Sequence, residues 1–232
     1  MSIITAIEPQ KSNSKNRGKR FNIFIDGRFS FGASAFTIME ANLKADRQIN
    51  QDEIDKLISK EDRSKLTNLT ANLLSLRPRS EKEIKDYLAG KIAGGNNIKF
   101  QQALESPLID QVIVKLKKYN YLNDAEFAKW FVASRNRSNP KGPALIKQEL
   151  KAKGISADII KKILSKGVNA QTLAQKALEK KAKSWKNLRG QEFKKKAYQY
   201  LAGKGFEYDT IHTVILNSFQ DLNKDSETSL RP

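Results

Sequence analysis

Hydrophobic positions along the chain follow two different spacings. In residues 21–31, FNIFIDGRFSF, aromatic and aliphatic residues alternate with others around Asp26 and Gly27, a pair suited to the positive φ angles of a tight hairpin turn. In residues 33–43 and 52–76, apolar positions instead recur every three or four residues, which is typical of amphipathic helices. The pattern therefore predicts a β-hairpin followed by a helical protein.

Two segments near the N-terminus interrupt this picture. Residues 1–20 are polar, with Ser, Asn, Lys and Arg dominating from position 11, and we expect a loop or mobile arm over most of that stretch. Within the second helical stretch we expect a break at about residues 60–63. The hairpin is thus the only β element that the sequence predicts.

The second half of the chain contains a repeat with a fixed offset. Leu150, Lys153, Gly154, Ile155, Asp158, Ile160 and Ile163 are matched, 51 residues later, by Leu201, Lys204, Gly205, Phe206, Asp209, Ile211 and Val214. A fixed offset indicates that one supersecondary unit is used more than once. The five residue types of segment 87–91, YLAGK, recur in segment 200–204, which adds a third member to the repeat.

The clearest unit has recognisable helix ends. Asn123 is placed to cap a first helix, Pro143 suits the first turn of a second, and Gly154 suits the left-handed position after its C-terminus. Ser156 then caps a third helix. The first helix presents a predicted inner face of Phe127, Ala128, Phe131 and Val132.

The units on either side are less regular. In the first, Ser80 and Glu83 have the spacing of a capping box, whereas segment 94–97, GGNN, predicts a loop. In the last, the basic first half is longer, and residues 218–232 show no periodicity, so that we expect a mobile tail.

These signals predict an all-α fold of tandem three-helix, helix-turn-helix-like repeats behind a small N-terminal extension with a β-hairpin and helices. The predicted divisions are an N-terminal extension at 1–62, a first repeat at 63–119 with an inserted loop at 93–106, a second repeat at 120–166, a third at 167–217 and the tail at 218–232.

Composition argues against catalysis. The chain has no Cys and one His, which leaves little for thiolate metal sites, cysteine nucleophiles or histidine acid–base chemistry. His212 has no partners at ligand spacing, and no Gly-rich phosphate loop ending in Lys-Ser or Lys-Thr occurs. We therefore expect a protein that is not an enzyme and that needs no cofactor or metal.

The N-terminus lacks the 7–15-residue apolar core of a signal peptide, and no apolar run approaches the roughly 20 residues of a spanning helix. We expect a soluble cytoplasmic protein and a monomer.

The formal net charge of +18 is concentrated in one region. Residues 115–205 hold 23 Lys and Arg against 6 Asp and Glu, a local net charge of +17. Such an imbalance favours a polyanionic partner, most often nucleic acid. A solvated Lys-rich helical surface and an anionic membrane surface remain as alternatives, although the basic helices lack the bulky apolar faces of interfacial helices.

Several landmarks in the middle unit resemble the RecX family. They are Tyr121-Leu122-Asn123-Asp124, Phe127-Ala128, Arg135 with Arg137, Lys141-Gly142-Pro143 and Glu149-Leu150 followed by Lys153-Gly154-Ile155. The resemblance covers about residues 66–216 and is clearest in the second repeat. The first repeat departs from the family pattern in its longer loop at 93–106 and in having Lys91-Ile92 where a Lys-Gly pair would stand.

The resemblance implies an elongated, curved array of three-helix units. It also implies a modulator, usually a negative one, of RecA recombinase filaments on single-stranded DNA, with roles in homologous recombination, DNA repair and the SOS response. The implied partners are the RecA filament and single-stranded DNA, with non-specific double-stranded DNA as a further one and no membrane.

Candidate contact residues cluster in the second and third repeats. They are Arg135, Arg137, Lys141, Lys147, Lys151, Lys153, Trp185, Lys186 and Arg189. Lys147 and Lys151 share a helix face because they are four residues apart, and Trp185 is a candidate for base stacking. The residues that define the structural motif are Tyr121, Asn123, Phe127, Phe131, Gly142, Pro143, Leu150, Gly154 and Ile155.

These residues allow both a functional and a purely structural interpretation, and the class of protein also has an alternative. Gly142 and Pro143 would let the polar segment before them, residues 136–141, approach a ligand and would expose amides at a helix start, a natural phosphate site. Each Lys taken alone is equally well explained as part of a solvated helix face. A plain DNA-binding protein is the alternative to a recombinase regulator, since three-helix units resemble helix-turn-helix modules.

Overall fold

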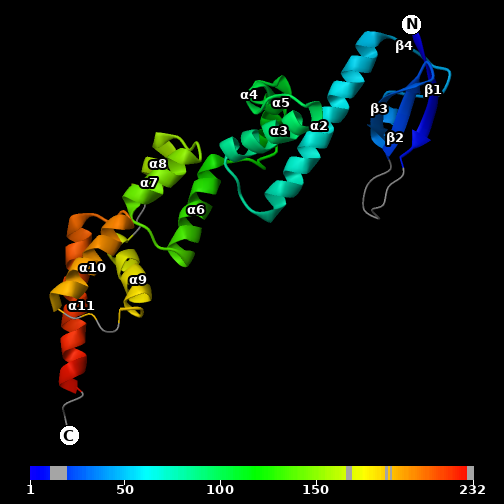
Figure 1. Cartoon of the computed structure of the whole chain (residues 1–232). Coiled ribbons are helices and arrows are strands. Elements are labelled where there is room, and N and C mark those ends of the chain that lie inside the picture. Colours follow the sequence, from blue (N-terminus) through cyan, green and yellow to red (C-terminus); the bar gives the residue numbers. More distant parts are fainter. Residues whose placement is uncertain (11–19, 166–168, 186–187, 189, 229–232) are drawn as a thin grey trace. The chain divides into compact units, whose positions relative to one another are not determined.

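The computed structural model describes all residues except 11–19, 166–168, 186–187, 189 and 229–232, with side chains as far as residue 218. It divides into two compact units, Met1–Arg77 with Lys85–Tyr121, and Pro78–Ile84 with Leu122–Pro232. Helices form most of the described chain, and the described strands all belong to the first unit (Figure 1). The predicted helical class with a small N-terminal β region is confirmed.

The first unit begins with a four-stranded antiparallel sheet in the order β3-β2-β1-β4. Its strands are β1 (Ser2–Pro9), β2 (Arg20–Ile25), β3 (Arg28–Ser34) and β4 (Gln48–Ile49). Asp26 and Gly27, with φ angles of 49° and 78°, form the turn between β2 and β3, so the predicted hairpin is confirmed.

The expectation of a loop in the first 20 residues is wrong for β1. This strand pairs with β2 on one side and with β4 on the other, and its Ile4 is fully buried. Both partners lie far along the sequence, so local pattern alone did not reveal the strand. The part of the predicted arm at 11–19 lies outside the described residues.

A buried carboxylate joins the sheet to the helices that follow, α1 (Ala35–Glu40) and α2 (Gln51–Leu76). Glu61 of α2 accepts hydrogen bonds from the Ser34 amide at 2.9 Å and from the Thr37 hydroxyl at 2.5 Å. It also pairs with Arg20 at 3.0 Å. The predicted break at residues 60–63 is wrong, because α2 passes unbroken through them and through the boundary placed after residue 62. These contacts of Glu61 hold that part of α2 against the sheet and α1.

The next helices are α3 (Glu81–Asn96), α4 (Phe100–Leu104) and α5 (Pro107–Lys118). At the start of α3, Ser80 Oγ accepts a hydrogen bond from the Glu83 amide at 3.1 Å. In turn, the Glu83 carboxylate accepts one from the Ser80 amide at 3.3 Å. The predicted capping box is confirmed.

The predicted loop at 93–106 is wrong over most of its length. Helix α3 continues through Gly94, Gly95 and Asn96, and α4 occupies five of the remaining positions. Glycine inside a helix costs only about 1 kcal/mol relative to alanine, and the packing of the adjoining Ile92, which is 8% exposed, offsets such a cost. The helix ends at Asn96, and the next residue, Asn97, has a left-handed φ of 51°.

The second unit contains two successive three-helix repeats, each with its own hydrophobic core. The helices are α6 (Asp124–Ser138), α7 (Pro143–Ala152) and α8 (Ala157–Ser165), then α9 (Ala170–Ala182), α10 (Gly190–Gly203) and α11 (Tyr208–Thr228). Asn123 caps α6 by accepting from the amides of Ala125 and Glu126 at 3.0 and 3.2 Å, as predicted. The expected tail from residue 218 is wrong as far as Thr228, since α11 extends to that residue.

The same turn ends α7 and α10. Gly154 and Gly205 have φ angles of 78° and 79°. The Ile155 amide donates to the Leu150 carbonyl at 3.1 Å, and the Phe206 amide donates to the Leu201 carbonyl at 3.2 Å. This is the hydrogen-bond pattern of a Schellman motif. The 51-residue offset in the sequence therefore corresponds to a repeated local structure.

Candidate functional site

Glu149 on α7 gathers two of the predicted cations. Arg135 Nε donates to one carboxylate oxygen at 3.0 Å, and Lys141 Nζ pairs with the other. The Arg135 guanidinium also lies 4.8 Å from the centroid of the Phe131 ring, a cation–π distance. Burial acts to raise the pKa of Glu149, but the hydrogen bonds from Lys141 and Arg135 outweigh it, so that the pKa lies below its usual value. Glu149 is therefore a carboxylate that anchors the segment between α6 and α7.

Two lysines of the third repeat reach the end of α6 and the segment that follows it, and we call residues 137–142 the connector. Lys180 Nζ donates to the carbonyls of Arg137 and Ser138 at 3.5 and 3.4 Å. These carbonyls lie at the C-terminus of α6, where the helix dipole favours a cation. Lys204 Nζ donates to the Asn139 side chain. The end of α6 is thus bound from the next repeat.

Lys141, Lys180 and Lys204 form a group that we call the junction lysines. Burial, and then the positive charges of Lys141 and Lys180, lower the pKa of Lys204. A like charge close to an amine disfavours its charged form, and a nearby anion favours that form. The junction between the two repeats therefore brings three amines together from two repeats.

The glycine of the connector has a packing role. The Gly142 amide donates to the Lys204 carbonyl at 2.8 Å, and a Cβ built on Gly142 would lie 2.0 Å from the Gly205 carbonyl oxygen. Gly205 in turn lies against Leu145, in the first turn of α7. The hypothesis that Gly142 and Pro143 expose amides to a phosphate is therefore wrong, because the Gly142 amide is used between repeats and Pro143 has none.

An equivalent contact joins the turn of the second repeat to the start of α3. A Cβ on Gly154 would lie 2.8 Å from Lys82 Cβ, and Lys153 Nζ pairs with Glu83 at 2.8 Å. Asp124 accepts from the Glu81 amide at 2.8 Å, so it caps α3 while its neighbour Asn123 caps α6. Each Lys-Gly turn thus packs on the start of the middle helix of the repeat before it.

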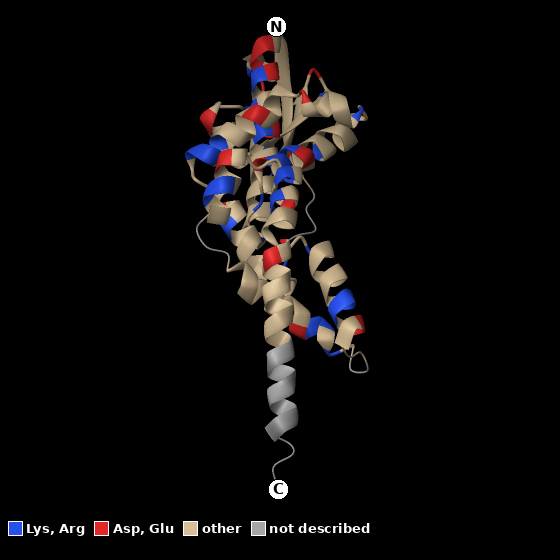
Figure 2. Ribbon diagram, turned by 90° about the vertical axis from the view of Figure 1, so that its left-hand side faces the viewer, with Lys and Arg blue, Asp and Glu red and all other residues tan. Residues whose placement is uncertain are grey.

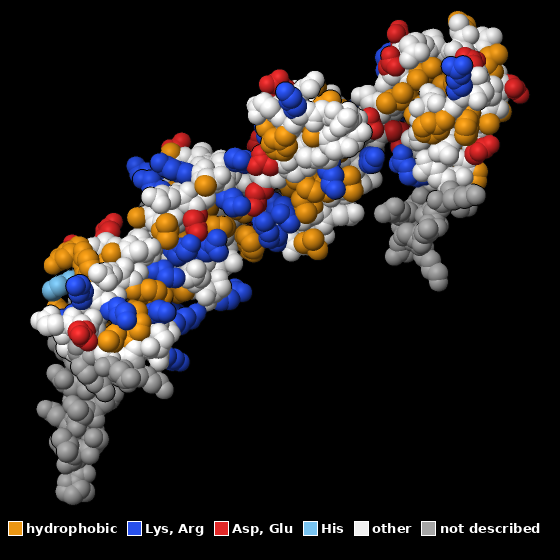
Figure 3. All heavy atoms as spheres, viewed as in Figure 1, with side chains coloured by type: hydrophobic (Ala, Val, Ile, Leu, Met, Phe, Trp, Pro, Cys, Tyr) orange, Lys and Arg blue, Asp and Glu red, His pale blue; other side chains and the backbone are white. Residues whose placement is uncertain are grey.

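The remaining candidate cations lie on the surface. Arg137, Lys147 and Lys151 are exposed, whereas Arg135, Lys141 and Lys153 are only partly exposed and take part in ion pairs. Figure 2 shows Asp and Glu interspersed with Lys and Arg on the helices. On the face drawn in Figure 3, Lys and Arg side chains crowd the surface over α6 to α10.

Trp185 belongs mainly to the third repeat's own packing. It is partly buried and meets Phe193 and Tyr200 edge to face, with ring centroids 6.1 and 5.7 Å apart. Lys196 Nζ lies 6.0 Å from the ring centroid. Lys186 and Arg189, the other two candidates of this segment, lie outside the described residues.

The motif residues of the second repeat are nearly all structural. Phe127, Phe131, Leu150 and Ile155 are buried in its core, and Pro143 opens α7 behind Gly142. The exception is Tyr121, which is 63% exposed.

Sequence reasoning missed Glu149 as an organiser and missed Lys180 and Lys204 at the connector. For Lys204 a signal was available, because it is the repeat counterpart of Lys153, which was a candidate. For Lys180 no local signal exists: it lies 43 and 42 residues from the carbonyls it binds.

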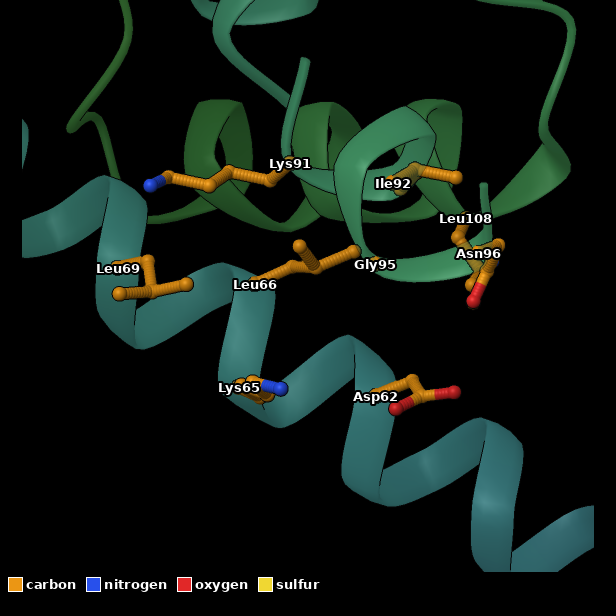
Figure 4. Close-up of a pocket in the computed structure, with 9 residues that line it drawn as sticks. All are labelled: Asp62, Lys65, Leu66, Leu69, Lys91, Ile92, Gly95, Asn96 and Leu108. Atoms are coloured by element: carbon orange, nitrogen blue, oxygen red, sulfur yellow. The ribbon is translucent and has the colours of Figure 1, made fainter. Parts of the chain in front are cut away.

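The first unit contains a small hollow of about 160 Å³ beside α2. Its lining is Asp62, Lys65, Leu66, Leu69, Lys91, Ile92, Gly95, Asn96 and Leu108. Figure 4 shows Leu66 pointing toward Gly95, while Lys91 and Asp62 lie at opposite ends of the hollow. The charged groups do not converge, so the hollow presents no arrangement for acid–base chemistry.

In the described part of the chain, His, Asp and Glu side chains do not gather in groups of three or more that would hold a metal ion. The helices of the same residues are all too short or too polar to cross a membrane.

Residues 123–164 match the family model described as the second three-helix domain of RecX, and residues 169–215 match the third. Residues 2–50 match the Regulatory protein RecX N-terminal domain. A relative named Regulatory protein RecX from Bacillus velezensis is 34% identical over 231 residues, which cover 98% of this chain and 81% of the relative. The chain belongs to the RecX family.

Other members of the RecX family give the same result. The Regulatory protein RecX of Bacillus subtilis strain 168 is 34% identical over 98% of this chain and 81% of its own length. That of Clostridioides difficile strain 630 is 33% identical over 93% of this chain and 95% of its own length.

Solved structures agree on the fold. A crystal structure of a regulatory protein RecX superposes with a TM-score of 0.63 at 22% identity, over 92% of this chain and 98% of that one. The crystal structure of RecX from Lactobacillus salivarius gives a TM-score of 0.54 at 27% identity, over 68% of this chain and 97% of that one.

Proposed function

We propose that this RecX-family chain is a regulatory protein that acts, mostly by inhibition, on a RecA recombinase bound to single-stranded DNA. It binds the nucleoprotein filament through the basic surface of the second and third repeats and so modulates recombination and DNA repair. The observation that carries the proposal is the group of junction lysines at the connector, in a region with a local net charge of +17.

The electrostatic argument concerns phosphates. Each phosphate that a cation neutralises releases condensed counterions, which favours binding at low salt. Lys141 and Lys180 repel Lys204, and Arg137, Lys147 and Lys151 are exposed on the second repeat. A polyanion therefore gains affinity at this surface both from new contacts and from relief of repulsion.

The action is regulatory and not enzymatic. The relatives carry the name Regulatory protein RecX, and the candidate site consists of cations, a bridging carboxylate and backbone contacts. This set provides binding and positioning, and it lacks a paired nucleophile and base.

The test is the ATP hydrolysis of a RecA recombinase on single-stranded DNA, titrated with the chain. We expect suppression of hydrolysis, at well below one chain per recombinase if filament growth is stopped, or near saturation if the filament groove is coated. Failure to change hydrolysis at any ratio contradicts the proposal.

A charge reversal locates the surface. Arg137→Glu combined with Lys147→Glu should weaken inhibition while helical content stays unchanged. The matched control is Lys44→Glu with Lys56→Glu, since both residues are exposed lysines of the first unit. Equal inhibition by the two double variants would place the contact elsewhere, and a strong sequence preference for duplex DNA would favour a general DNA-binding protein instead.

A further inference from the structure

The third repeat carries exposed aromatic rings on a face that has no part in the connector. Tyr198 of α10 is 41% exposed and Tyr208 of α11 is 62% exposed. Their ring centroids are 6.0 Å apart, and the ring of Tyr208 is stacked on that of His212 at 5.9 Å. Tyr198 therefore meets the Tyr208 ring edge to face, at an interplanar angle of 63°, while His212 is stacked on Tyr208.

These rings border a groove with a volume of about 300 Å³. Its lining comes from the i, i+3, i+4 and i+7 positions of one face of α10 and from one face of α11. The residues are Gln191, Lys194, Lys195, Tyr198, Tyr208, His212, Ile215 and Leu216. Figure 3 shows the pale blue His side chain with hydrophobic side chains and a Lys or Arg side chain around it.

Packing alone does not account for the exposed rings. The core of the third repeat is filled by residues such as Phe193, Leu201 and Phe206, and the aromatic cluster around Trp185 lies within that packing. Tyr198 and Tyr208 instead leave large parts of their rings in water, which gains little hydrophobic stabilisation.

The chemistry of the groove fits one kind of ligand. The lining contains Lys194 and Lys195 and contains no Asp or Glu. Aromatic faces beside cations are how proteins hold unpaired bases, since the rings stack on bases while the cations meet the backbone phosphates. Duplex DNA would present phosphates but keep its base faces covered.

We propose that the groove between α10 and α11 binds a nucleobase of single-stranded nucleic acid by stacking on the ring of Tyr208, with Tyr198 against the edge of the base and Lys195 beside the phosphate. The groove is a second contact, separate from the junction lysines. It rests on the proposed function in one respect, namely that the single strand is the DNA bound by the recombinase.

The test uses the chain alone, without recombinase. Fluorescence anisotropy compares a labelled thymidine oligonucleotide with an abasic oligonucleotide of the same length and charge. The wild-type chain should bind the thymidine strand about 10-fold more tightly, as expected for one stacked base. The double variant Tyr198→Leu with Tyr208→Leu should bind both strands equally, at the wild-type affinity for the abasic strand.

Two control variants make the result specific. Tyr198→Phe with Tyr208→Phe keeps the ring faces and should keep the preference for bases. Tyr119→Leu with Tyr121→Leu removes two tyrosines of similar exposure, 60% and 63%, that lie outside the groove, and should also keep it. Equal binding of both strands by the wild type, or a preference that survives in the leucine variant, overturns the inference.

Cross-linking provides a second readout that needs no variant. A strand carrying 4-thiothymidine should cross-link to peptides from residues 191–216 of the wild-type chain, and cross-links confined to other peptides overturn the inference. Inhibition of recombinase ATP hydrolysis is measured in parallel. If the chain inhibits hydrolysis but shows no preference for bases, the proposed function is supported and the nucleobase site in the groove is contradicted. Inhibition that requires the tyrosines, again without base preference, assigns the groove to a protein contact and also contradicts the inference.

Discussion

Gly142 lies directly against the backbone of Gly205, so that a Cβ atom at position 142 would stand 2.0 Å from the Gly205 carbonyl oxygen. The Gly142 amide donates to the neighbouring Lys204 carbonyl at 2.8 Å. The connector of the second repeat and the turn of the third are therefore joined backbone to backbone. No side chain fits between them without moving one of the two repeats.

Gly142→Ala should destabilise the second unit by about 2–3 kcal/mol, because the overlap involves backbone that cannot rotate away. Thermal unfolding followed by circular dichroism measures the change. The matched control is Gly90→Ala in the interior of α3, where no heavy atom lies within 4 Å of the new Cβ. That change should stabilise its helix by about 0.5–1 kcal/mol. Equal effects of the two changes would contradict the proposed close contact.

Glu149→Gln should strengthen binding to single-stranded DNA and weaken the fold slightly. The change removes a negative charge from among Arg135, Lys141 and the other cations, and it makes the two partners available to phosphates. The slope of log affinity against log salt should steepen by about one, at a stability cost of about 1–2 kcal/mol.

Binding titrations across a salt series check this prediction. Glu126→Gln is the control, because Glu126 pairs with Lys129 at an exposed site on α6. Weaker DNA binding by the Glu149 variant would indicate that the ion pairs serve only to hold the connector in place.

Acid should destabilise the first unit through Glu61. Burial acts to raise the pKa of Glu61, but hydrogen bonds from Ser34 and Thr37 and the charge of Arg20 outweigh it, so that the pKa is lowered from 4.5. A carboxyl with a lowered folded pKa contributes stability that is present above the unfolded pKa. That contribution is lost as the pH falls below about 4.5 and through the folded pKa.

Hydrogen exchange of β3 and α1 measured from pH 6 downward tests this expectation. Glu61→Gln should remove most of the acid sensitivity of these elements and should lower their stability near neutral pH. Glu40→Gln, which alters an ion pair with Lys60 at a more exposed site, should leave the acid sensitivity in place.

Asn123→Ala should cost about 1 kcal/mol, because Asn123 caps α6 with two hydrogen bonds. Ser156→Ala should cost less, since the distance from the Ser156 hydroxyl to the Ile159 amide is 3.5 Å. Urea unfolding of both variants provides the comparison. A larger loss for the Ser156 variant would contradict the assigned caps.

Features that depend on near neighbours were predictable. The Asp26-Gly27 turn depends on the φ angles of two adjacent residues. The capping box of Ser80 with Glu83 and the turn at Gly154 each involve hydrogen bonds between residues a few positions apart. Strand β1 was not predictable in this way, because both of its partners are distant in sequence. The sequence did not predict that Gly94 and Gly95 are helical. Two adjacent glycines favour a loop, whereas α3 continues through both of them.

The candidate site likewise combines features set by neighbouring residues with contacts between residues far apart in the sequence. By itself the sequence determined the helical repeats, their ends and the region of excess charge, because caps, turns and periodicity are local and charge needs only counting. Only the tertiary structure decided that Lys180 and Lys204 meet the connector and that Gly142 joins two backbones. Lys204 and Asn139 are 65 residues apart, and a contact over that distance depends on how one repeat packs on the next.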